Sequence, residues 1–134
     1  MTSAIGQRLR VLSGEFVVEH LAGGVQAPAG EWLALVRAPE GLTVVRPARP
    51  GDDQGTERWS ALYGGDTAHG LDVPGMLAAL LIPLAAGQVP VFVASTFHAD
   101  LVLVPSAMVP AAVAALQAAG HVIVWSAPGP ASVR

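Results

Sequence analysis

The chain has 134 residues, of which 52% are hydrophobic and 13% are charged, so we expect a folded core and exclude intrinsic disorder as its main state. Its 10 acidic residues outnumber 7 basic residues, all of them arginine, so the basic surface that a nucleic-acid partner requires is not expected. Cysteine is absent, which excludes disulfide bonds and thiolate metal sites and fits a reducing cytoplasm. These features predict a compact cytoplasmic protein.

A membrane span is the next class to consider, because residues 73–99 contain no charged side chain. Pro83, Gly87 and Pro90 interrupt this stretch, and its hydrophobic period changes there. We therefore expect a helix, a turn and a buried strand, with no membrane partner. The first seven residues lack a basic region followed by an apolar run, so no signal peptide is expected either.

The first 58 residues are predicted to be mainly β-structure. Apolar patterns favour strands at residues 8–12 and 15–21, and a hairpin built from 32–37 and 42–46. The turn of that hairpin ends in Gly41, where a positive φ is expected. Residues 47–58 follow with prolines, glycines and paired acids, a composition typical of a linker.

Residues 59–126 show a more regular pattern. The predicted elements are a strand at 59–63, a helix at 75–86 that Pro83 should bend, strands at 89–95 and 101–104, a helix from a Ser106 cap to about residue 119, and a strand at 121–125. This β-α-β-β-α-β order is ferredoxin-like, with two helices on one face of an antiparallel sheet. The predicted class is therefore α+β, followed by a flexible tail at 127–134.

One motif, Leu-Asp-Val-Pro-Gly-Met-Leu at residues 71–77, resembles the D-x-P-G-x-L signature of ACT domains, the small regulatory modules that bind amino acids. Residues 83–97 and the S-T-F-x-x-D run at 95–100 extend the likeness to small bacterial tandem ACT proteins, relatives of the eukaryotic cytosolic arginine sensors. The resemblance implies two ferredoxin-like ACT-like halves. Residues 1–58 would be a degenerate, mostly β half, and residues 59–126 the second ACT domain.

The resemblance also places a small-molecule ligand, an amino acid, at the interface between the ACT-like units, near the loop before the first helix. The start of a helix offers unpaired N–H groups that suit a carboxylate. A lone carboxylate between apolar strands suits an ammonium or guanidinium group. The ligand-binding residues implied are Asp72, Pro74, Gly75, Met76, Ser95, Thr96, Phe97 and Asp100.

Each of these residues also has a purely structural interpretation. The Pro74-Gly75 pair can simply begin a helix, and Asp100 can be a solvated turn residue. Ser95 and Thr96 can satisfy the backbone of the same turn. Both interpretations stay open at this point.

Neither a metal nor a cofactor nor a catalytic residue is expected. Asp66, His69 and His98 can be grouped with Asp100, but they fall in different loops and lack a close-spaced ligand pair. The two nearly uncharged helices are expected to pack on another surface, which predicts a homodimer.

The sequence thus predicts a non-catalytic regulatory protein that senses an amino acid and acts on another protein. Chains that resemble it usually carry threonine where this one has Ala99, and often an aromatic residue in the loop at 65–69. An interaction or dimerisation module that has lost its ligand is therefore the alternative.

Overall fold

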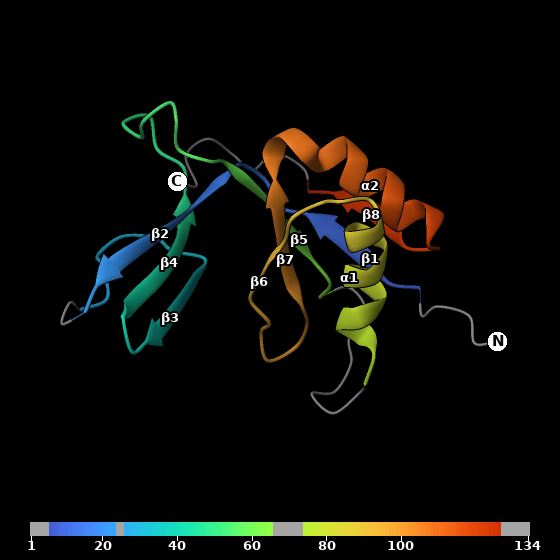
Figure 1. Cartoon of the computed structure of the whole chain (residues 1–134), viewed down its shortest axis with the longest axis horizontal. Helices are drawn as coiled ribbons and strands as arrows, with labels where there is room; N and C mark the ends of the chain where they lie inside the picture. Colours follow the sequence, from blue (N-terminus) through green and yellow to red (C-terminus); the bar gives the residue numbers. More distant parts are fainter. Residues whose placement is uncertain (1–5, 24–25, 66–73, 127–134) are drawn as a thin grey trace.

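The computed structural model describes residues 6–23, 26–65 and 74–126. These residues form one mixed sheet with two α-helices on one face, while three of its strands fold across the other face (Figure 1). The elements are β1 (Arg8–Val11), β2 (Phe16–Ala22), β3 (Ala34–Ala38), β4 (Gly41–Pro47), β5 (Trp59–Tyr63), α1 (Met76–Ala86), β6 (Phe92–Val93), β7 (Leu101–Pro105), a 3₁₀ turn (Ser106–Met108), α2 (Val109–Ala118) and β8 (Val122–Trp125). From β5 to β8 the order is β-α-β-β-α-β, which confirms the α+β class and the expected element order.

The strand β1 lies between β5 and β8. It pairs antiparallel with β5 and parallel with β8, while β5 pairs antiparallel with β7 and β7 with β6. The expectation of an antiparallel sheet is therefore wrong in one respect, because a strand from the first 58 residues enters the sheet and runs parallel to β8. Leu9 and Val11 of β1 are 1% and 5% exposed, and their burial beneath the helices accounts for this position.

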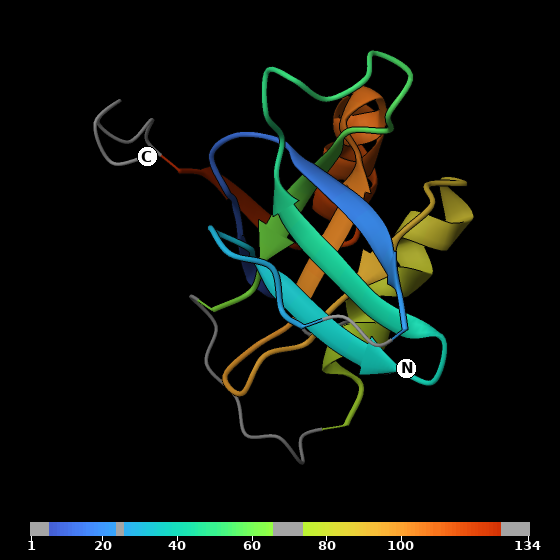
Figure 2. The same ribbon diagram turned by 90° about the vertical axis from the view of Figure 1, so that its left-hand side faces the viewer.

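Strands β2, β4 and β3 pair in antiparallel fashion and cross the face of the sheet opposite the helices, as Figure 2 shows. Phe16 lies opposite Trp59, and this pair joins β2 to β5. Gly41 adopts φ 141° at the β3–β4 turn, which confirms the predicted positive φ. The elements described before β5 are all strands, as expected for a mostly β first half. The assignment of residues 1–58 as an ACT-like half stays a prediction.

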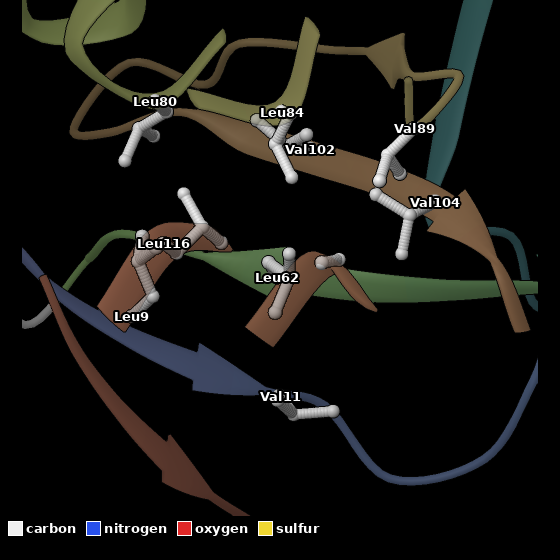
Figure 3. Close-up of a cluster of buried hydrophobic side chains, with 10 residues drawn as sticks. Leu9, Val11, Leu62, Leu80, Leu84, Val89, Val102, Val104 and Leu116 are labelled. Carbon is white, nitrogen blue, oxygen red and sulfur yellow. The ribbon is translucent and has the colours of Figure 1, made fainter. Parts of the chain in front are cut away.

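Two hydrophobic clusters fill the spaces between the layers. The helix-side cluster joins α1 and α2 to β1, β5 and β7, and Figure 3 shows Leu80, Leu84 and Leu116 facing the strands. The opposite cluster places Phe16 and Val45 against Ala61 and Leu103. Strand β7 is buried at every position because it contributes to both clusters.

Local signals at the helix ends were correct in some places and wrong in others. Gly120, at φ 97°, follows the end of α2 as predicted. Ser106 does not cap α2: a 3₁₀ turn begins there, and its hydroxyl group shares a 2.9 Å hydrogen bond with the hydroxyl of Ser60. The strand expected at 89–95 is confined to Phe92–Val93, because the chain then turns toward β7.

Within the described residues, no helix is long and apolar enough to cross a membrane.

The loop between β4 and β5, expected to be a linker, is anchored by Asp52. Its carboxylate accepts a 2.7 Å bond from the buried Arg46 guanidinium and a 2.7 Å bond from the Arg49 backbone N–H. The Arg46 hydrogen bond, followed by the Arg49 N–H, holds the pKa of Asp52 well below its usual range. Arg46 also donates to Glu19 at 2.8 Å, so the loop is tied to two strands.

Candidate functional site

The predicted ligand-binding residues that the structure describes lie at one end of the molecule. The start of α1 and the connection between β6 and β7 lie at the same end in both views of the chain (Figures 1 and 2). The end of β5 reaches the same place, because the Gly64 N–H donates a 3.0 Å hydrogen bond to the Asp100 carbonyl group. The structure thus brings the two predicted groups of residues together around the end of β5.

Asp100 immediately precedes β7 and is only 7% exposed. Its Oδ1 accepts a 2.9 Å hydrogen bond from the Ser95 hydroxyl group. Asp100 is also the sole charged residue between positions 73 and 133. A carboxylate in such surroundings is a strong acceptor for a cationic or N–H-bearing group, because little water competes for it. Its burial argues against the interpretation of Asp100 as a solvated turn residue.

The turn before Asp100 is held by Thr96. The Thr96 hydroxyl donates to the Ala99 carbonyl at 3.0 Å and accepts from the N–H groups of His98 and Ala99 at 3.2 and 3.0 Å. This hydroxyl group therefore forms hydrogen bonds with the turn backbone, in agreement with the structural interpretation of Thr96. Phe97 is 71% exposed at the tip, where its ring lies 5.0 Å from the His98 ring in an edge-on arrangement.

The residues immediately before the first turn of α1 are exposed. Gly75 occupies the N-cap position at φ 86°, and no side chain among the described residues caps the helix. Pro74 and Gly75 are exposed, and the space around the Gly75 Cα is open. The Met76 side chain is instead buried at 5% exposure and belongs to the packing of the helix. Asp72, like Asp66 and His69, lies outside the described residues.

Gln7 is a part of this region that the sequence did not predict. It is 3% exposed, and its Nε2 donates a 2.7 Å hydrogen bond to the Met76 carbonyl group in the first turn of α1. A Cβ added to Gly64 would lie 3.8 Å from the Gln7 Oε1, so the Gln7 amide lies between the end of β5 and the start of α1. No motif marks a glutamine ahead of the first strand, so no sequence signal was available.

His121 is the second buried polar residue that was not assigned a role. Its Nδ1 accepts the Gln7 backbone N–H at 3.1 Å, so its proton lies on Nε2, which is 2.9 Å from the Ala79 carbonyl group. In an α-helix the carbonyl of residue 79 would accept from the N–H of residue 83, but proline at 83 has none. His121 therefore supplies the donor that Pro83 lacks.

The arrangement combines backbone donors at a helix start with one buried carboxylate. Such a pair of features can hold a small molecule that carries both an acidic and a basic group. Within the described residues, no group of three His, Asp or Glu side chains is placed to hold a metal ion.

Comparison with known proteins finds a match to one family. Residues 54–118, slightly less than half of the chain, match the family model of the ACT domain, so this part of the chain is similar to ACT domains. The relationship to the arginine sensors stays a prediction.

Solved structures with the same fold include a protein from Agobacterium tumefaciens at 23% identity and a TM-score of 0.76, covering 95% of this chain and 98% of that one. A second is a Vibrio cholerae protein of unknown function, described as a possible transport protein, at 23% identity and a TM-score of 0.69, covering 89% of this chain and 91% of that one. At this identity the likeness establishes the fold alone. Comparison with curated proteins finds no match.

Proposed function

We propose that this protein is a non-catalytic regulator that binds an amino acid at the end of β5, between the first turn of α1 and Asp100. The ACT domain match supports a regulatory role with a small-molecule ligand. The observation that carries the proposal is the buried Asp100 carboxylate, oriented by the Ser95 hydroxyl group at the same end of the fold as the exposed helix start.

An amino acid fits the chemistry of both parts of this region. Its ammonium group pairs with the Asp100 carboxylate, in a charge-assisted hydrogen bond that low local polarity strengthens. Its carboxylate accepts from the N–H groups at the start of α1, where the helix dipole is positive. A Cβ added to Gly75 would meet no atom of the described residues within 4 Å, so the space beside the Gly75 Cα is open.

A thermal-shift screen of the purified chain against the twenty amino acids, with purine nucleotides as controls, tests this function. A ligand at 100 times its Kd adds about 2.7 kcal/mol to the free energy of unfolding. In a chain of this size that raises Tm by roughly 5–10 °C. We expect one amino acid, or a small chemically related group, to respond.

The variant that tests the site is Asp100→Asn, because asparagine keeps an acceptor for Ser95 and removes only the charge. Asp53→Asn is the matched control, since Asp53 is an exposed acid in the loop before β5. The response should disappear in Asp100→Asn and persist in Asp53→Asn. An amino-acid response that is unchanged in Asp100→Asn would place the ligand elsewhere, and silence of the wild-type chain across the panel would refute amino-acid binding.

The alternative function is an interaction or dimerisation module that has lost its ligand, and one observation favours it. Ile82 on α1 is 67% exposed, and neither helix carries a charged residue. Such a surface is typical of an interface, and we propose a homodimer in either case. Sedimentation velocity measures the oligomeric state: Ile82→Glu should yield monomers, whereas Val36→Glu, at a 49% exposed position on β3, should leave a dimer intact.

A further inference from the structure

A hollow lies where the three-stranded part of the sheet meets β5. It has a volume of about 490 Å³ and is lined by Phe16, Gly30, Glu31, Trp32, Leu33 and Pro47. We call it the junction hollow, because Phe16 lies opposite both Pro47 of β4 and Trp59 of β5.

The walls of the junction hollow are held in place by the fold. Phe16 is 7% exposed and forms part of the cluster that joins the two sides of the molecule. The Leu33 N–H donates to the Val45 carbonyl at 2.6 Å, which fixes the segment carrying Trp32 against β4. Trp32 nevertheless remains 43% exposed, so part of its ring surface is available to a ligand.

The chemistry of the lining is asymmetric. Phe16, Trp32, Leu33 and Pro47 are apolar, and Glu31 is the one charged residue among the six that line the hollow. Apolar and aromatic walls with a single acidic group favour an apolar molecule that carries a positive charge. Indole rings attract cations electrostatically, and the Glu31 carboxylate attracts the same cation.

We propose that the junction hollow binds an organic ammonium ion, with its apolar body against the aromatic walls and its charge beside Glu31. This site is distinct from the proposed amino-acid site. Trp59 and Tyr63 are the first and last of the 5 residues of β5, so the hollow and Asp100 lie at opposite ends of a strand about 16 Å long.

The experiment uses benzyltrimethylammonium as the probe, followed by two-dimensional NMR of the ¹⁵N-labelled chain. The sequence contains 3 tryptophans, so each indole N–H gives one signal, and the Trp32 signal is identified by its loss in Trp32→Leu. We expect saturable shifts of the Trp32 indole signal and no shift of the Trp125 indole signal. Benzyl alcohol and phenylacetate serve as neutral and anionic controls, and neither should match the cation.

Two variants separate the contributions of the ring and the charge. Glu31→Gln alters an exposed side chain without changing its shape, and it should weaken the probe about two- to fivefold. Trp32→Leu should abolish the shifts of the remaining signals around the hollow. Trp125→Leu is the control for loss of an exposed indole ring and should bind as the wild type does.

The proposal is overturned by unchanged spectra at saturating probe, by equal shifts with benzyl alcohol, or by full affinity in Glu31→Gln. None of these results depends on the amino-acid screen, because the probe is not an amino acid and Asp100→Asn should bind it normally.

Discussion

The hydrogen bond between His121 and the Ala79 carbonyl group leads to a quantitative prediction about α1. If His121 replaces the backbone donor that Pro83 lacks, the two residues must be energetically coupled. His121→Leu removes the acceptor of the Gln7 N–H and the donor to Ala79 in one step. Pro83→Ala restores the backbone N–H that donates to the Ala79 carbonyl group in a regular α-helix.

The magnitudes follow from the number of buried polar groups left without a partner. Each such group costs about 1–3 kcal/mol, so His121→Leu should lower the free energy of unfolding by about 2–6 kcal/mol in the wild-type background. In the Pro83→Ala background only the Gln7 N–H loses its partner, and the cost should fall to about 1–3 kcal/mol. The expected coupling free energy is therefore about 1–3 kcal/mol.

Urea unfolding of the four chains, followed by circular dichroism, measures this double-mutant cycle. His20→Leu serves as the control, because His20 is exposed on β2 and its replacement should change stability by less than about 0.5 kcal/mol. Additive effects of the two substitutions, within about 0.5 kcal/mol, would refute the idea that His121 compensates for the proline.

Three further predictions concern the core, the loop and the turns. Leu84→Ala should cost about 3–5 kcal/mol because its side chain is 0% exposed, whereas Val36→Ala, at a 49% exposed position on β3, should stay within about 0.5 kcal/mol in urea unfolding. The lowered pKa of Asp52 stabilises the fold above the usual carboxyl pKa of about 4, and this contribution is lost as the pH falls through the lower folded-state pKa. The stability gap between wild type and Asp52→Asn should thus be constant at neutral pH and narrow below about pH 4, in urea titrations at each pH. Gly75→Ala should cost about 1–2 kcal/mol from its positive φ alone, and Gly41→Ala should lower Tm further because its Cβ would also clash with a backbone carbonyl of β2.

Elements with a strong local pattern could be predicted closely from the sequence. The strand β5 has the predicted bounds, and α1 begins one residue after the predicted start. Both carry dense apolar residues next to glycine or proline, so neighbouring residues determine where they begin and end. The grouping of Asp100 with the start of α1 came from a family resemblance rather than from any local pattern, and its role in ligand binding stays a prediction.

The arrangement of β1 could not be predicted in the same way. Its alternation of Arg8, Leu9, Arg10 and Val11 identifies a strand with one buried face, but it does not specify the neighbouring strands. Pairing with β5 and β8 joins residues more than fifty positions apart, and only the packing of the whole core selects it.

The polar partners were missed for a related reason. Gln7 and His121 are 114 positions apart, and the pairing of β1 with β8 brings them together. Ser106 illustrates the converse. Its local sequence predicts a helix cap, but its hydroxyl group instead forms a hydrogen bond with the Ser60 hydroxyl on β5. Side-chain hydrogen bonds inside a core depend on tertiary contacts that local patterns do not contain.

The position of β5 bears on whether the two proposed sites influence each other. This strand pairs with β1, β2 and β7, and its three central residues are buried. A close-packed central strand does not bend independently of its neighbours, so local adjustments at one end are damped before they reach the other. A ligand that only reorders the start of α1 should therefore leave benzyltrimethylammonium affinity unchanged. A shift of that affinity on saturation with the amino acid would require the strands to move as a unit, since coupling needs two arrangements that both ligands distinguish. Measuring the affinity for benzyltrimethylammonium with and without the amino acid tests whether β5 couples the two sites. Equal affinities indicate a rigid strand, and different affinities indicate coupling.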